Sequence, residues 1–254
     1  MKKILFTALI CSLVSFSQST AQTTYFPSNL KDASLEPLYQ EAVFAWFNVE
    51  HSKFEALMSQ VLEAEPDNFM ALAHSAFHAY HVKKTDAFRE YAARALKVGP
   101  PNDKVKGYAD VLKARLETPK ADISQEIATL IYGNMKVTEA NLMQAILCLE
   151  TGQPEIAHEV LFRTKNLAPE YAPTYNLLGY TAMDIGQMEQ AGKAFKQYLS
   201  LMPQNPNAYD SMGDYYMAVK EYAKAKEAFE KAYQLDNRFT FSLDKAKEAE
   251  GMIK

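Results

Sequence analysis

The 254-residue sequence contains little cysteine and little glycine, and both scarcities narrow the possible folds. The two cysteines are Cys11 and Cys148, and Cys11 lies in an N-terminal segment that we expect to be removed. One remaining cysteine cannot form an intramolecular disulfide, so packing must stabilise the fold. With only 9 glycines and 48% hydrophobic residues, the composition favours a helical protein with a substantial core.

Signatures of catalysis and of nucleic-acid binding are also missing. The sequence has no nucleophile elbow, no phosphate-binding glycine loop and no Cys/His pairing pattern. Cys148 lies in an expected helix and is best interpreted as a small buried hydrophobic residue. The formal charge of −4 comes without a basic stripe, which argues against a nucleic-acid partner. We therefore expect a non-enzymatic protein without a cofactor.

The first 21 residues predict an export signal. Lys2 and Lys3 precede an apolar run, and the small residues Ser19 to Ala21 follow it, which is the pattern of a secretory signal peptide. The apolar run is shorter than the roughly 20 residues that span a bilayer, so no membrane span is expected in the mature chain. Cleavage after Ala21 would leave a formal charge of about −6. We expect a periplasmic protein, with secretion as the second possibility.

A 34-residue period runs through the chain in three residue classes. Prolines, small residues and alanines each recur at intervals of 34, or at 69, which is 34 plus 35. The three series are Pro66, Pro100, Pro169 and Pro203; Ala42, Ala76, Ala145, Gly179 and Gly213; and Ala157, Ala191 and Ala225. A period of this length indicates stacked hairpins, because one helical hairpin cannot bury its apolar face alone.

Two units resemble the tetratricopeptide repeat (TPR) pattern of Leu-Gly, then Tyr, then Ala, Phe and Pro. The matching residues are Leu178, Gly179, Ala191, Phe195 and Pro203, and then Met212, Gly213, Tyr216, Ala225 and Phe229. The resemblance implies an all-α, right-handed solenoid of about six helix-turn-helix hairpins. Glycine in each unit would let two helices cross closely, and phenylalanine would fill the remaining space.

The period also divides the chain. We expect an extended segment over residues 22–34, a repeat array over 35–239 and a capping helix over 240–254. The six units would begin near Leu35, Phe69, Asp103, Thr138, Ala172 and Pro206. In the third unit Asp110 takes the small-residue position, so we expect looser packing or a kink there.

The resemblance implies that the first helix of each hairpin lines a concave binding surface. In the fifth unit, Asn176, Tyr180 and Met183 share a helix face that the repeat pattern leaves free. Stepping by the repeat gives a predicted groove with an aromatic N-terminal end and an acidic C-terminal end. Its selected residues are Tyr39, Trp46, Phe77, Tyr80, Ile146, Asn176, Tyr180, Met183, Asp210, Asp214 and Met217.

This groove predicts a protein or peptide partner with apolar residues toward Trp46 and basic residues toward Asp210 and Asp214. Exposed aromatic area of this kind is typical of binding hot spots. Two alternatives stay open. The groove side chains can pack only within the array, and Tyr25-Phe26 of the N-terminal segment can fold back to fill the aromatic end.

Three histidines give a weaker hypothesis. His74, His78 and His81 have a spacing that places them on one side of a helix, where two of them could share a metal ion. No cysteine or carboxylate lies beside them in sequence, so we expect packed or solvated histidines. The leading interpretation is an exported TPR scaffold, and the alternative is a self-associating structural module that forms a homo-oligomer.

Overall fold

The computed structural model describes residues 24–253, and these residues form helices and turns without a β-strand. The signal peptide expected over residues 1–21 lies outside the described residues. Within the described part of the chain, no helix has both the length and the apolar character needed to cross a membrane.

Twelve α-helices pair into six antiparallel hairpins, and a last helix follows them. The hairpins are α1 (Glu36–Phe47) with α2 (His51–Ala64), α3 (Phe69–His81) with α4 (Thr85–Val98), α5 (Lys106–Glu117) with α6 (Ser124–Ile131), α7 (Thr138–Glu150) with α8 (Pro154–Leu167), α9 (Ala172–Asp184) with α10 (Met188–Leu201), and α11 (Pro206–Ala218) with α12 (Tyr222–Leu235). The last helix is α13 (Thr240–Gly251), and the short 3₁₀ helices η1 (Ala33–Leu35) and η2 (Asp103–Val105) precede α1 and α5. This architecture confirms the expected all-α repeat solenoid.

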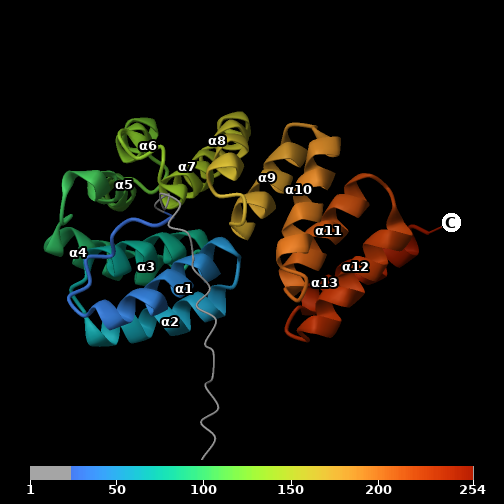
Figure 1. Ribbon diagram of the computed structural model, residues 1–254, viewed down its shortest axis with the longest axis horizontal. Coiled ribbons are helices and arrows are strands. Elements are labelled where there is room, and N and C mark those ends of the chain that lie inside the picture. Colours follow the sequence, from blue (N-terminus) through green and yellow to red (C-terminus); the bar gives the residue numbers. More distant parts are fainter. Residues whose placement is uncertain (1–23, 254) are drawn as a thin grey trace, which may run out of the picture.

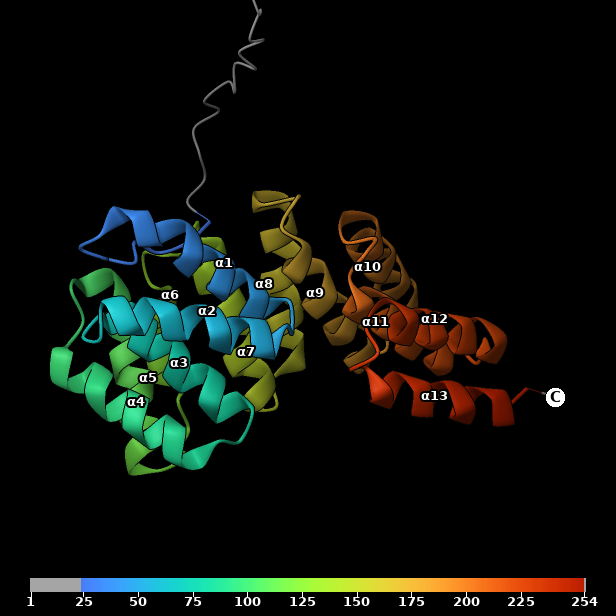
Figure 2. The same cartoon turned by 90° about the horizontal axis from the view of Figure 1, so that it is seen from below.

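The hairpins stack in chain order along a curved path, with α1 to α8 in one half and α10 to α13 in the other (Figures 1 and 2). Local sequence fixes where several helices begin. The Asn68 side chain accepts the Ala71 N–H at the start of α3. At the start of α11, Asn205 caps the helix and Pro206 occupies its first turn, as expected from the preferences of these positions.

Close helix crossings have the expected cause. A side chain added at Gly179 would overlap the ring of Phe195, and one at Gly213 would overlap the ring of Phe229. Both phenylalanines are fully buried between the two helices of their hairpins. In each of these hairpins, glycine therefore permits the approach that the phenylalanine ring completes.

The third hairpin departs from the others. Its second helix, α6, has only 8 residues. The close crossing with α5 is made by Gly107, which faces the backbone of Leu130, while Asp110 is half-buried. The small-residue position has thus moved about one turn toward the start of α5.

The curvature brings the first hairpin against the fifth. The Tyr198 hydroxyl on α10 donates a hydrogen bond to Asn48 in the α1–α2 turn, at 2.8 Å. Asn205, just after α10, donates to the Glu50 carboxylate, also at 2.8 Å. These contacts join residues about 150 positions apart, so the array is closed at this point as well as stacked between neighbours.

Candidate partner-binding site

The predicted groove residues lie on α1, α3, α7, α9 and α11, the first helices of their hairpins. Their exposure differs sharply. Five side chains are buried: Tyr39, Trp46, Phe77, Asn176 and Asp210. Six are half-buried: Tyr80, Ile146, Tyr180, Met183, Asp214 and Met217. The described structure therefore leaves the second set, and not the first, in contact with solvent.

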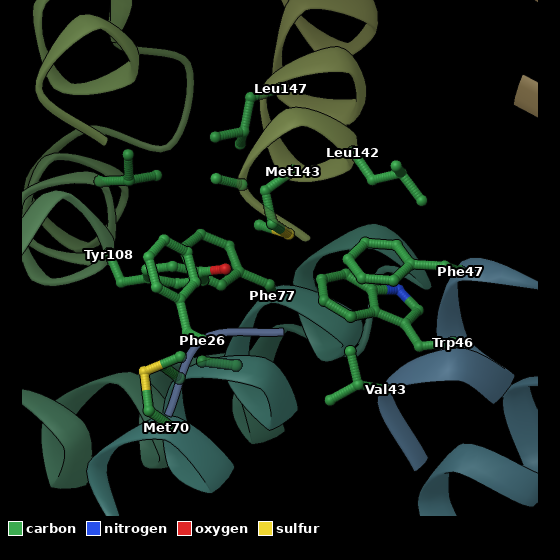
Figure 3. Packing of buried hydrophobic residues seen from close by; sticks show 14 of the residues in the cluster. Phe26, Val43, Trp46, Phe47, Met70, Phe77, Tyr108, Leu142, Met143 and Leu147 are labelled. Atoms are coloured by element: carbon green, nitrogen blue, oxygen red, sulfur yellow. The ribbon is translucent and has the colours of Figure 1, made fainter. Parts of the chain in front are cut away.

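The aromatic end is part of the hydrophobic core. Trp46 stacks on Phe47 with ring centroids 5.0 Å apart, and it also meets the edge of His74. Phe77 packs edge-to-face on Tyr108 of α5. Figure 3 shows side chains from α7, among them Leu142, Met143 and Leu147, on one side of these rings. These aromatic side chains therefore pack within the array, which was the alternative to a role in partner binding.

The N-terminal segment completes this packing. Phe26 is 2% exposed, and its ring lies edge-to-face on Tyr108 at 5.7 Å; Figure 3 shows it between Tyr108 and Met70. Tyr25 packs against the core beside Tyr171, which precedes α9. The segment does fold back and fill the aromatic end, so that end is closed by residues of the same chain.

A buried carboxylate lies beside this segment. Glu139, in the first turn of α7, has a fully buried side chain. Its Oε2 accepts the Phe26 N–H at 2.8 Å, and its Oε1 accepts the Tyr108 hydroxyl at 2.7 Å. His74 Nε2 lies 3.1 Å from Oε1, at ion-pair distance. A buried carboxylate is tolerated only with such partners, so Glu139 makes this region specific for the groups now around it.

Surrounding tyrosines are held in their neutral form. Burial is the main cause that raises the pKa of Tyr39, Tyr108 and Tyr171 well above its usual value, and the Glu139 charge adds to it. Tyr39 lies 3.0 Å from His74 Nδ1, and the same nitrogen lies 2.9 Å from the Met70 carbonyl. These neutral hydroxyls act as hydrogen-bonding groups of the core.

The middle of the predicted groove is partly occupied by an arginine. Arg115 of α5 donates to the Tyr80 hydroxyl at 2.6 Å and to the Pro119 carbonyl at 2.8 Å. Its guanidinium also covers the Tyr80 ring at 4.6 Å. Ile146 is half-buried nearby on the core surface. Tyr80 is therefore held by its own chain.

The acidic end is paired with a lysine from the capping helix. Lys245 of α13 donates to Asp210 at 3.0 Å and to Asp214 at 2.8 Å. Burial lowers the pKa of Lys245, but the two carboxylates outweigh burial and leave it raised. The pKa of Asp210 is raised, mainly by its own burial. The expected basic neighbour of these aspartates is thus present within the chain.

The remaining part of the predicted groove lies on α9 and α11. Tyr180 packs on Phe195 and donates to Asp214 at 2.9 Å, which fixes its hydroxyl. Met183 and Met217 are half-buried beside small core clusters. Asn176 is buried and accepts the Ser211 hydroxyl. Two flexible methionines and one partly exposed carboxylate therefore form the open part of the predicted groove.

The three histidines do not converge. His74 faces Tyr39 and Glu139 in the core, His78 Nε2 lies 3.2 Å from His51 Nδ1 on α2, and His81 is exposed. Among the described residues, no group of three or more His, Cys, Asp or Glu side chains is arranged to hold a metal ion.

Sequence reasoning missed Glu139 and Lys245. Glu139 precedes the predicted groove residue Ile146 by seven residues, so extending the groove by two helical turns along the same helix face would have included it. Lys245 gave no comparable signal, because the repeat pattern weakens beyond residue 239.

Comparison with known proteins agrees with this architecture. The family model described as tetratricopeptide repeat matches residues 172–205 and 206–239. No curated protein shows a significant sequence match to the chain. Among solved structures, PilW, described as a widely conserved type IV pilus biogenesis factor, is 21% identical with a TM-score of 0.51. The alignment covers 84% of this chain and 98% of PilW.

A second structure with the same architecture is human IFIT1. It is 20% identical with a TM-score of 0.53, and the alignment covers 72% of this chain and 45% of IFIT1. At these identities the two structures establish the fold alone. The hairpin geometry and the two matched units define an α-helical repeat scaffold, a class that generally mediates protein–protein interaction. Residues 172–239 are therefore two tetratricopeptide repeat units, and the remaining hairpins share their helix-turn-helix architecture.

Proposed function

We propose that this chain is an exported, non-enzymatic adaptor that binds a protein or peptide partner on the concave side of α9 and α11. One observation carries the proposal: the chain itself buries Tyr39, Trp46 and Phe77 and holds Tyr80 with Arg115, while Tyr180, Met183, Asp214 and Met217 stay partly exposed. Methionines suit such a surface because their flexible side chains adapt to a partner.

The proposed partner segment combines apolar and basic residues. Apolar side chains would pack on Met183 and Met217, while a basic group would approach Asp214, whose side chain is 25% exposed despite its pairing with Lys245. An amphipathic helix or an extended peptide can present this combination.

A capture experiment with matched variants tests this surface. The chain from residue 22 onward, tagged at its C-terminus, is used to capture partners from envelope extract. We expect Met183→Lys combined with Met217→Lys to abolish capture of the partner, because two charges would replace the apolar contact. The control is Gln234→Lys on the exposed surface of α12. Equal capture by all three proteins would contradict the proposed surface.

Export is tested separately. We propose delivery to the periplasm, with release from the cell as the alternative, and cleavage after Ala21 in either case. Fractionation followed by mass spectrometry of the intact protein should give a chain that begins at Gln22. A chain that retains its first residues in the cytoplasm would contradict this part of the proposal.

Self-association is a second candidate, favoured by a groove between the α1–α2 turn and the start of α13. Val49, Met202, Phe239 and Phe241 contribute to the groove, and Phe241 is 49% exposed. An end helix of another copy would cover this surface. Light scattering over a range of concentrations tests it: a dimer that Phe241→Ser dissociates supports self-association, whereas a monomer at every concentration contradicts it.

A further inference from the structure

The cleft that holds residues 24–28 has the features of a peptide-binding site. The bound residues have no helical or strand structure, and the helices α3, α5 and α7 surround them. All the residues that form the cleft come after the segment in the sequence. The segment therefore lies in the cleft as a peptide from another molecule would.

Main-chain atoms of the segment are recognised directly. The Glu139 N–H donates to the Thr24 carbonyl at 2.9 Å, and the Glu139 carboxylate accepts the Phe26 N–H at 2.8 Å. Farther along, Asn68 donates to the Ser28 carbonyl at 3.0 Å. Hydrogen bonds to the backbone give affinity for an extended peptide irrespective of its side chains.

Side-chain selectivity comes from the Phe26 pocket. The ring is buried against Tyr108 and lies beside Met70 (Figure 3). Pro27 is exposed, and a proline biases the preceding residue toward extended backbone, which is the form that the cleft holds. Tyr25 adds a second aromatic contact, at Tyr171.

The connection to the array leaves the segment separable. Residues 31–34 are exposed, and they join the segment to α1 through the short helix η1. Asn29, just before this connection, has a φ of +56°, a left-handed conformation that asparagine adopts more readily than most other non-glycine residues. The buried contacts of the segment are thus made before the chain reaches the connection.

We propose that this cleft is a peptide-binding site and that residues 24–28 are its resident ligand. The ligand that it takes from a partner is an extended peptide in which an aromatic residue is followed by Phe, Pro and Ser. The resident segment competes with such a peptide from an effective concentration on the order of millimolar, so it also limits access to the site. The inference rests on the proposed partner-binding function but uses a site other than α9 and α11.

The test uses the chain from residue 22 onward with a protease-cleavage sequence inserted between Lys31 and Asp32. After folding, cleavage turns the resident segment into a free ligand. A fluorescent peptide with the sequence of residues 24–31 is then added to cut and uncut protein. We expect the peptide to bind the cut protein and not the uncut protein, because only the cut protein can release its resident.

Two matched variants locate the contact. Phe26→Ala in the peptide should weaken binding by roughly 10- to 100-fold, since it removes the buried ring. Glu139→Gln in the protein should weaken binding by about 10-fold, because an amide accepts the Phe26 N–H less strongly than a carboxylate does. Glu159→Gln, on the exposed face of α8, is the control and should not change binding. If Glu139→Gln fails to fold, the peptide variant still decides the question.

Two outcomes would overturn the proposal. In the first, the cut protein keeps its helical circular dichroism but does not bind the peptide, whether or not residues 24–31 stay associated after cleavage. In the second, the uncut protein is a dimer, and Phe26→Ala in the protein dissociates it. That result would assign the cleft to a second copy of this chain instead of a different partner. Loss of peptide binding with intact capture through Met183 and Met217 would contradict this inference and leave the proposed function standing.

Discussion

Backbone strain in the described chain collects at the turns inside the hairpins. Five of these turns contain a residue with positive φ at the same repeat position, and they are Val49, Lys83, Gly152, Gly186 and Lys220. Glycine adopts this conformation freely, whereas other L-residues pay roughly 1 to 2 kcal/mol. Val49, with φ +64° and a β-branched side chain, is the least suitable of the five.

We therefore expect Val49→Gly to stabilise the protein by about 1 kcal/mol, after allowing for the greater freedom of glycine in the unfolded chain. Urea denaturation monitored by circular dichroism measures the change. The control is Val98→Gly, because Val98 is similarly exposed but lies in the last turn of α4 with helical φ. That substitution should destabilise the protein by roughly a few tenths of a kcal/mol, the difference in helix propensity between valine and glycine. A loss of stability in Val49→Gly would show that its side chain contributes more than its backbone costs.

Acid sensitivity is expected at His78. The pKa of His78 is lowered from 6.5 to about 4, mainly by burial and to a smaller extent by the nearby His51. The other charged groups facing it are Glu55, Lys84 and His81. The folded state thus binds this proton less readily than the unfolded state, so stability is present above pH 6.5 and is lost as the pH falls toward 4.

The loss amounts to on the order of 2 to 3 kcal/mol for one group with this shift. His78→Gln should remove that part of the pH dependence, and urea denaturation between pH 7 and about 4 measures it. The control is His81→Gln, whose side chain is exposed. An unchanged pH profile in His78→Gln would mean that other groups cause the acid sensitivity.

At the scale of elements, α13 is fixed to the array by charge as well as by packing. Ala246 and Ala249 bury its inner face against α12, while Lys245 reaches back to α11. Asp210 is buried and also accepts the Ser242 hydroxyl at 2.6 Å. The capping helix therefore neutralises two carboxylates that would otherwise face solvent or one another.

Lys245→Ala should destabilise the protein by roughly 1 to 3 kcal/mol, because it leaves Asp210 buried beside a second carboxylate without a cation. Urea denaturation at neutral pH is the measurement. Lys247→Ala is the matched control, since Lys247 forms an exposed pair with Asp244 that should contribute at most about 1 kcal/mol. Similar effects of the two substitutions would show that the pairing with Asp210 is unimportant for stability.

The repeat period allowed much of this element-scale description to be predicted. Helices α3, α7, α9 and α11 begin at Phe69, Thr138, Ala172 and Pro206, because caps, prolines and small residues recur with the hairpins. Segments outside the repeat lack these recurring residues, so their positions cannot be predicted from the period. Neither the burial of Phe26 nor the pairing of Lys245 follows from periodicity, since each depends on contacts with a distant helix.

The candidate site was less predictable than the fold for a related physical reason. A helix face left free by the repeat pattern can point to solvent or into the curve of the array, and sequence spacing is the same in both cases. Packing against other elements decides between them: Tyr39, Trp46 and Phe77 lie inside the main hydrophobic core. On α9 and α11 the same stripe leaves Met183 and Met217 partly exposed.

At the scale of the whole molecule, closure distinguishes this array from one held by neighbour contacts alone. In an open solenoid each hairpin depends on its two neighbours, and distant hairpins can unfold separately. Here Tyr198 and Asn205 contact the α1–α2 turn, and Phe44 of α1 packs edge-to-face on Tyr171 at 5.5 Å. The first hairpin is therefore coupled to the fifth without the intervening hairpins.

Tyr198→Phe should weaken that coupling selectively. The hydroxyl donates to Asn48, which is fully buried, and it accepts a hydrogen bond from Asn207 at 3.1 Å. Its removal leaves a buried amide without this partner, at a cost of roughly 1 to 3 kcal/mol. Hydrogen exchange followed by mass spectrometry should show faster exchange in α1, α2 and α10, with α12 unchanged. The control is Tyr209→Phe, whose hydroxyl makes an exposed bond to the Pro203 carbonyl. Equal exchange in both variants would mean that the two ends of the closed array do not stabilise each other.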